Sequence, residues 1–107
     1  MDEHEAVAAL AALGHEHRLR IFRLLVRAGE SGLRVGDIQR HLGLPPSTLA
    51  HHLDTLARAG LVRQHRCGRE VRSRVDFTRM NALLDHLREA CCAGVPSVAE
   101  KEEVTAR

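Results

Sequence analysis

The chain has 107 residues, a length typical of one domain, and it contains two Phe, no Trp and no Tyr. The scarcity of aromatic rings argues against single-strand nucleic-acid binding by base stacking, and the small size argues against a deep enzyme cleft. There is no run of about 20 apolar residues and no secretory leader, so neither a membrane span nor export is expected. Three cysteines make no disulfide framework, which favours a reducing cytoplasm.

The net charge of +2 conceals an uneven distribution. Residues 1–16 contain four carboxylates and neither Lys nor Arg, whereas residues 61–79 contain six arginines against Glu70 and Asp76. An acidic end and a basic patch favour a polyanion bound on one side of the molecule. All but one of the sixteen basic residues are arginine, which suits phosphate and guanine contacts, although GC-rich codon usage produces the same bias.

The first part of the chain is predicted to form two helices separated by a glycine. The helix over residues 2–13 places Val7, Leu10 and Leu13 on one face, and Asp2 is suited to cap its start. The helix over residues 17–28 is apolar around more than half of its circumference, as expected of a central helix.

A helix-turn-helix is predicted over residues 33–62. The first helix covers 33–43, and the glycine and two prolines that follow make a tight turn and stop it. The second helix has a buried stripe of three leucines at i, i+4 and i+7, namely Leu49, Leu53 and Leu56. Two short helices joined by such a turn indicate a helix-turn-helix.

The outward face of the second helix carries short hydrogen-bonding groups and imidazoles in place of the long side chains of a typical surface helix. Such a face suits the reading of base edges in a DNA major groove, although a merely solvated polar face is the alternative. The candidates for base and phosphate contacts are Ser47, Thr48, His51, His52 and Arg58.

A β-hairpin, a last helix and a tail complete the predicted fold. Strands over 62–67 and 71–75 flank a glycine turn, with one face apolar and the other basic. The hairpin residues predicted to contact phosphate or the adjacent minor groove are Arg63, Arg66, Arg69, Arg72 and Arg74. A helix over 77–92 would close the domain, 1–92, and residues 93–107 would form a flexible tail. The expected fold class is therefore mainly α with a β-hairpin wing, a winged helix-turn-helix.

This order of elements and three sequence motifs resemble the ArsR/SmtB family of bacterial repressors. The motifs are LGHEHRLRI at residues 13–21, LGLPPSTLAHHL at 42–53 and LARAGLV at 56–62, and the resemblance covers about residues 5–92. It implies a homodimer in the bacterial cytoplasm, with the first and last helices at the interface. It also implies an inverted-repeat operator that is bound without inducer and released when inducer binds. No enzymatic activity is expected.

The inducer site is predicted at Cys91 and Cys92. The family's Cys-Val-Cys thiolate site and its Asp-x-His zinc site both lack their ligands in this sequence. Adjacent thiols select soft ions, so trivalent arsenic, inorganic or methylated, is the expected inducer, and no resident cofactor is required. The family subgroup with such a pair has a third cysteine that is missing here. Cys67 could supply it from the hairpin, and two thiolates would suffice for a mono-organic arsenical.

Three alternatives to the arsenic site remain open. Thiol oxidation could be the signal, although a disulfide between adjacent residues is strained. Cys91 could be a small core side chain and Cys92 an idle thiol. The domain could also be a protein-interaction module that does not bind DNA. The eight histidines are scattered without an i, i+4 pair, so no histidine metal site is expected.

Overall fold

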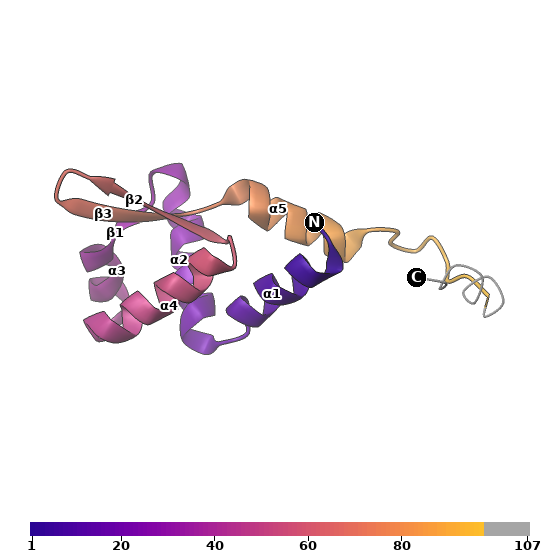
Figure 1. Ribbon diagram of the computed structural model, residues 1–107, viewed down its shortest axis with the longest axis horizontal. Helices are drawn as coiled ribbons and strands as arrows, with labels where there is room; N and C mark the ends of the chain where they lie inside the picture. Colours follow the sequence, from indigo (N-terminus) through magenta and orange to yellow (C-terminus); the bar gives the residue numbers. More distant parts are fainter. Residues whose placement is uncertain (98–107) are drawn as a thin grey trace.

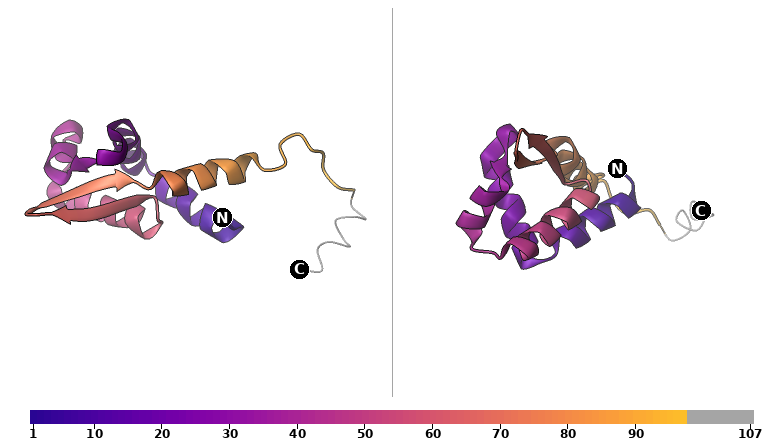
Figure 2. Two further views of the ribbon diagram at one scale, coloured as in Figure 1. Left: turned by 90° about the horizontal axis from the view of Figure 1, so that it is seen from above. Right: turned by 60° about the vertical axis from the view of Figure 1, so that its left-hand side comes forward.

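The structure, a computed structural model, describes residues 1–97, and in these residues five α-helices pack with a small antiparallel sheet that lies at one edge of the molecule (Figure 1). The elements in chain order are α1 (Glu3–Leu13), α2 (Glu16–Ala28), the 3₁₀ helix η1 (Gly29–Ser31), β1 (Leu33–Arg34), α3 (Val35–Leu42), α4 (Pro46–Arg58), β2 (Val62–Cys67), β3 (Glu70–Val75) and α5 (Phe77–Arg88). The prediction of a mainly α fold with a β-hairpin wing is confirmed. The hairpin and α5 follow one another along the long axis of the molecule (Figure 2).

The core lies where α2 and α4 meet the inner side of the hairpin. Leu49, Leu53 and Leu56 of α4 are completely buried, as their i, i+4, i+7 spacing predicts. Ile21 and Leu25 of α2 pack in the same cluster, which Leu61, Val62 and Val75 close from the side of the wing. The core therefore fixes α4 against α2 and leaves the opposite side of α4 to solvent.

The sheet has a third strand that the sequence did not predict. Leu33 and Arg34 form β1 and pair with Ser73 and Arg72, so β3 is the central strand of the order β1-β3-β2. The prediction that a helix begins at residue 33 is therefore wrong by two residues, since α3 begins at Val35. A strand of two residues has no periodicity by which it could be recognised.

Helix α1 packs through alanines, and its larger apolar side chains lie on the surface. Ala6, Ala9 and Ala12 are buried against the rest of the domain. Val7 and Leu10, which were predicted to share a face, are 59% and 43% exposed. The small alanines allow α1 to approach the core closely, and this leaves the Val7/Leu10 side without a partner in the protomer.

Helix α5 is shorter than predicted. It ends at Arg88, and the backbone then adopts positive φ at Ala90 (58°) and at Cys92 (61°). Side chains disfavour this left-handed conformation within a helix, so the two cysteines lie beyond α5 in a turn. The predicted tail, 93–107, lies mostly outside the described residues, and its flexibility stays a prediction.

Candidate DNA interface and thiol pair

Helix α4 presents its first turn to solvent without a side-chain cap. Its N-cap is Pro45 and its first residue is Pro46, so neither position supplies a capping side chain. The free N–H groups of this turn and the helix dipole together favour a phosphate at this end. Ser47 and His51 are exposed and Thr48 is half-buried. Within residues 1–97 the Ser47 and Thr48 hydroxyls make no hydrogen bond, which leaves them free for a ligand.

Arg58 lies at the other end of α4. Its Nη2 is 2.8 Å from Oδ2 of Asp54, one helical turn earlier, and both side chains are largely exposed. An exposed pair of this kind adds little stability and can be exchanged for a phosphate contact at small cost. Because Arg58 is about 17 Å from Ser47 along the helix axis, it cannot contact the same base pair. Its contact with DNA stays a prediction.

His52 does not belong to the exposed face of α4, and its prediction as a base-reading residue is wrong. Its side chain is 6% exposed, and its Nδ1 lies 3.4 Å from Nη1 of Arg18, which itself donates from Nε to the Ala12 carbonyl at 2.6 Å. The physical reason is spacing, because residue 52 follows Leu49 by three positions and precedes Leu56 by four. It therefore falls on the buried stripe, about 100° from His51.

Four histidines from the start of α2 and from α4 lie next to one another. The ring of His52 lies 4.6 Å from that of His15, 5.8 Å from that of His17 and 5.6 Å from that of His51. Burial lowers the pKa of His52, and the nearby His15 and Arg18 lower it further. In the described part of the chain no three His, Cys, Asp or Glu side chains are arranged to hold a metal ion. The cluster is therefore a packing contact between α4 and the start of α2.

The wing arginines fall into two groups. At the base of the hairpin, Arg63 donates to Asp76 at 2.8 Å, Arg72 donates to the Ser31 carbonyl at 3.2 Å, and Arg74 lies 3.6 Å from Glu30. At the tip, Arg66 and Arg69 are exposed and form no ion pair with any described residue. The tip arginines are therefore the ones whose charge is free for a phosphate, and the base arginines hold the wing to the domain.

The thiols of Cys91 and Cys92 lie side by side in solvent. Their Sγ atoms are 3.5 Å apart, without a disulfide, and both residues are exposed. The alternative in which Cys91 is a core side chain is thus excluded within the protomer. Cys67 is also exposed, but it ends β2 at the hairpin turn, at the opposite end of the molecule from α5 (Figure 1). The structure therefore does not bring Cys67 of the same chain to the pair.

Comparisons with known proteins agree with this arrangement. Residues 13–65 match the family model HTH_20, described as a helix-turn-helix domain. Over 88 residues the chain is 32% identical to the transcriptional activator HlyU of Vibrio cholerae, a match that covers 82% of this chain and 79% of HlyU.

Solved structures of related regulators have the same fold. The ArsR-like transcriptional regulator from Rhodococcus sp. RHA1 matches with a TM-score of 0.71 and 26% identity, over 95% of this chain and 87% of that chain. HlyU from Vibrio cholerae matches with a TM-score of 0.67 and 31% identity, over 86% and 99%. The antimony-specific transcriptional repressor AntR matches with a TM-score of 0.62 and 26% identity, over 96% and 82%.

The chain belongs to the ArsR/SmtB family. It is accordingly a DNA-binding transcriptional regulator and not an enzyme, as the sequence predicted. In this ArsR/SmtB regulator α3 and α4 form the helix-turn-helix, and β2 and β3 form the wing. No helix among residues 1–97 has the length and apolar character needed to cross a membrane.

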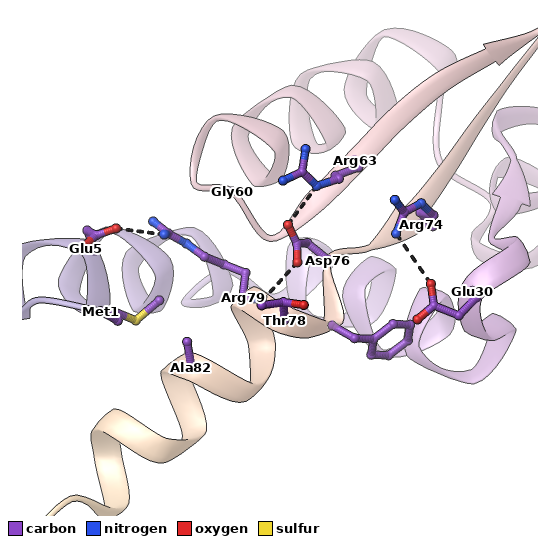
Figure 3. A pocket seen from close by; sticks show the side chains of 11 residues that line it. Met1, Glu5, Glu30, Gly60, Arg63, Arg74, Asp76, Thr78, Arg79 and Ala82 are labelled. Carbon is purple, nitrogen blue, oxygen red and sulfur yellow. Dashed lines mark hydrogen bonds and ion pairs between the residues drawn. The ribbon is translucent and has the colours of Figure 1, made fainter.

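A polar cleft of about 760 Å³ lies between the base of the wing, α1 and α5 in this ArsR/SmtB regulator (Figure 3). Asp76 accepts hydrogen bonds from the Arg79 backbone N–H at 3.0 Å and from Arg63 Nε at 2.8 Å, so it caps α5 and holds the base of β2. Arg79 donates to Glu5 at 2.8 Å and ties α5 to α1. The Arg79 backbone N–H, and then Arg63, lower the pKa of Asp76. Sequence patterns gave no signal for this network, because its members are up to 74 residues apart.

Proposed function

We propose that the protein is a dimeric repressor that leaves an inverted-repeat operator when trivalent arsenic binds Cys91 and Cys92. The observation that carries the proposal is the pair of exposed thiols, 3.5 Å apart, at the end of the helix that connects to the wing. AntR, a similar structure, is a repressor specific for antimony, another thiophilic metalloid, which supports an inducer of this chemical class.

The DNA-binding surface consists of the first two turns of α4 and the tip of the wing. Ser47, Thr48 and His51 reach the base edges, while Arg66 and Arg69 contact phosphate or the adjacent minor groove. These five predicted side chains are not buried, and none of them forms an ion pair with a described residue. In a symmetric dimer the two α4 helices would enter successive major grooves, which requires an inverted repeat.

Dimerisation through α1 and α5 would cover apolar side chains that the protomer exposes. Val7 and Leu10 of α1 and Leu84 and Leu87 of α5 are each more than 40% exposed. Four large apolar side chains on adjacent helices indicate an interface, because soluble monomers seldom expose contiguous apolar patches. Sedimentation should give a dimer for the unaltered protein and a monomer for Leu84→Glu. A monomeric unaltered protein would refute this part of the proposal.

The thiol pair binds arsenic by ligand exchange. Arsenous acid exchanges two of its hydroxides for the two thiolates, so that two As–S bonds form, two As–O bonds break and the thiol protons leave in two water molecules. The third position keeps a hydroxide, or a methyl group in a methylated arsenical, so two cysteines complete the site. Positive φ at Cys92 supports this binding mode, because a pair outside the helical ladder can turn both sulfurs toward one arsenic atom.

A route from the thiol pair to the DNA surface runs through α5. His86 Nε2 lies 2.7 Å from Glu3 of α1, and Asp76 at the other end of α5 holds the base of the wing. Binding that reshapes the end of α5 would alter its packing on α1 and on the partner protomer. The spacing of the two α4 helices would change in turn, and the operator would be released.

The test is fluorescence anisotropy with DNA from the region upstream of the protein's own gene. Arsenite or a trivalent monomethyl arsenical should release the unaltered protein and the matched control Cys67→Ser. Neither compound should release the variants Cys92→Ser and Cys91→Ser from the DNA. Full release of the double variant Cys91→Ser/Cys92→Ser by either compound would refute the arsenic site and leave the DNA surface unaffected.

Thiol oxidation is the second candidate signal, because two sulfurs at 3.5 Å are close enough to react with each other. Loss of two electrons and two protons to a diazenedicarboxamide oxidant would join Cys91 and Cys92 in a disulfide. Release by the oxidant without release by arsenicals would favour this candidate. The strain of a disulfide between adjacent residues argues against it.

A further inference from the structure

An apolar groove on α2 and α5 is a second potential ligand site, separate from the thiol pair. It has a volume of about 620 Å³, within the range of about 300–1,000 Å³ that is usual for small-molecule sites. Leu19 and Leu24 of α2 and Met80 and Leu83 of α5 are among its apolar lining residues. Leu84, which also belongs to the proposed dimer interface, lies at the edge shared by the two surfaces. The polar lining residues are all arginines of α2, namely Arg20, Arg23 and Arg27.

These three arginines lack counter-charges. Arg20, Arg23 and Arg27 are exposed, and none pairs with a carboxylate in the described part of the chain. Their i, i+3, i+7 spacing places three positive charges within about 10 Å along one side of the helix. Like charges at this spacing repel each other, so an anion in the groove would relieve a cost that the protomer otherwise bears.

A second copy of the chain is a poorer match to this charge than a small anion. The acidic helix of a partner would be α1, but its carboxylates already have partners within the chain. Asp2 and Glu5 form the capping box of α1, Glu5 also accepts from Arg79, and Glu3 lies 2.7 Å from His86. The groove thus combines an apolar surface with a rim of arginines that this chain's acidic helix does not neutralise.

We propose that the groove binds an amphipathic anion, with an alkyl chain against the leucines and Met80 and a carboxylate against the arginines of α2. Arginine suits this role because its planar guanidinium binds a carboxylate through two parallel hydrogen bonds. The groove borders Leu83 and Leu84 of α5, so an occupied groove acts on the helix that reaches the wing. The site gives the regulator a metabolite input that is independent of the cysteines.

Direct binding can be measured without DNA or arsenic, by calorimetry with decanoate below its micelle concentration. Decanoate should bind to the unaltered protein and to Cys92→Ser alike, whereas acetate should not bind and decanol should bind about tenfold more weakly. The variant Arg20→Gln/Arg23→Gln/Arg27→Gln should lose at least about tenfold in decanoate affinity, since a hydrogen bond to a charged group contributes this much. Arg40→Gln, an exposed arginine of α3 away from the groove, is the matched control.

Absence of decanoate binding to the unaltered protein would overturn the proposal, as would equal affinity in the triple variant. Sedimentation of the triple variant distinguishes the other occupant. If the variant changes from dimer to monomer and the unaltered dimer binds no decanoate, the groove is covered by a second copy of the chain. Circular dichroism of each variant checks that its helices are intact, and the single variant Arg23→Gln repeats the test with a smaller change.

Discussion

Two glycines that border η1 allow the attachment of the wing to the core to be tested quantitatively. Gly29 (φ 75°, ψ −157°) and Gly32 (φ 64°, ψ −162°) have nearly the same backbone conformation, one that other residues adopt only with strain. A Cβ at Gly29 would meet nothing within 4 Å. A Cβ at Gly32 would lie 2.2 Å from the Ser73 carbonyl oxygen of β3 and 2.9 Å from Cβ of Arg74.

The two alanine variants should therefore share a backbone cost and differ by a steric one. Gly29→Ala should lose about 1–3 kcal/mol of unfolding free energy from strain alone. Gly32→Ala should lose about 1–3 kcal/mol more, because β3 must move away or the core must expand. Gly32→Ala should also bind operator more weakly than Gly29→Ala, because β3 carries half of the wing.

The assay is urea unfolding followed by circular dichroism, with free energies compared at equal m-values so that the denatured states are comparable. The informative quantity is the difference in unfolding free energy between Gly29→Ala and Gly32→Ala, because the backbone strain common to both variants cancels in it. Losses that agree within about 0.5 kcal/mol would show that β3 yields freely to a methyl group at residue 32. The close approach of η1 to β3 would then contribute nothing to the position of the wing.

Three further outcomes are expected. Because the pKa of His52 is lowered in the folded state, its unfolded form takes up the proton first. Stability should thus be full above about pH 6.5 and fall on acidification, and His52→Gln should flatten this dependence in urea midpoints measured between about pH 7.5 and 5.5. Arg66→Gln and Arg69→Gln should each lower the magnitude of the slope of log affinity against log salt concentration by about one unit, because each removes one phosphate-binding charge. Unchanged slopes would show that the wing tip does not contact DNA. Asp2→Ala should cost about 1 kcal/mol in thermal unfolding by opening the capping box of α1.

The helical periodicities could be read from the sequence because they depend on local spacing. The leucine stripe of α4 was recognised in this way, and the same spacing would have placed His52 on it. Residue type alone predicts that His52 shares the exposed polar face of His51, but adjacent residues on a helix point about 100° apart. Spacing along the helix decides which side chains face the core, whatever their polarity. The buried imidazole of His52 is tolerated because its Nδ1 lies within hydrogen-bonding distance of Arg18.

Features that depend on contacts between distant residues could not be read in this way. The pairing of β1 with β3 joins residues about 40 positions apart, and the histidine cluster joins the start of α2 to α4. In α1 the sequence revealed the apolar faces but not which of them would be buried. Alanines were buried in preference to Val7 and Leu10 because two helices approach most closely where side chains are smallest.

The alanine face of α1 has a consequence for the choice of operator. Ala9 is completely buried, so a larger side chain such as valine at this position would displace α1 outward from its own protomer. In the proposed dimer α1 also meets the partner, and such a displacement would change the distance between the two α4 helices. Successive major grooves on one side of DNA are about 34–36 Å apart, and the dimer must match that repeat. The methyl groups of α1 would thus act as a spacer that sets the distance between operator half-sites, although none of them touches DNA.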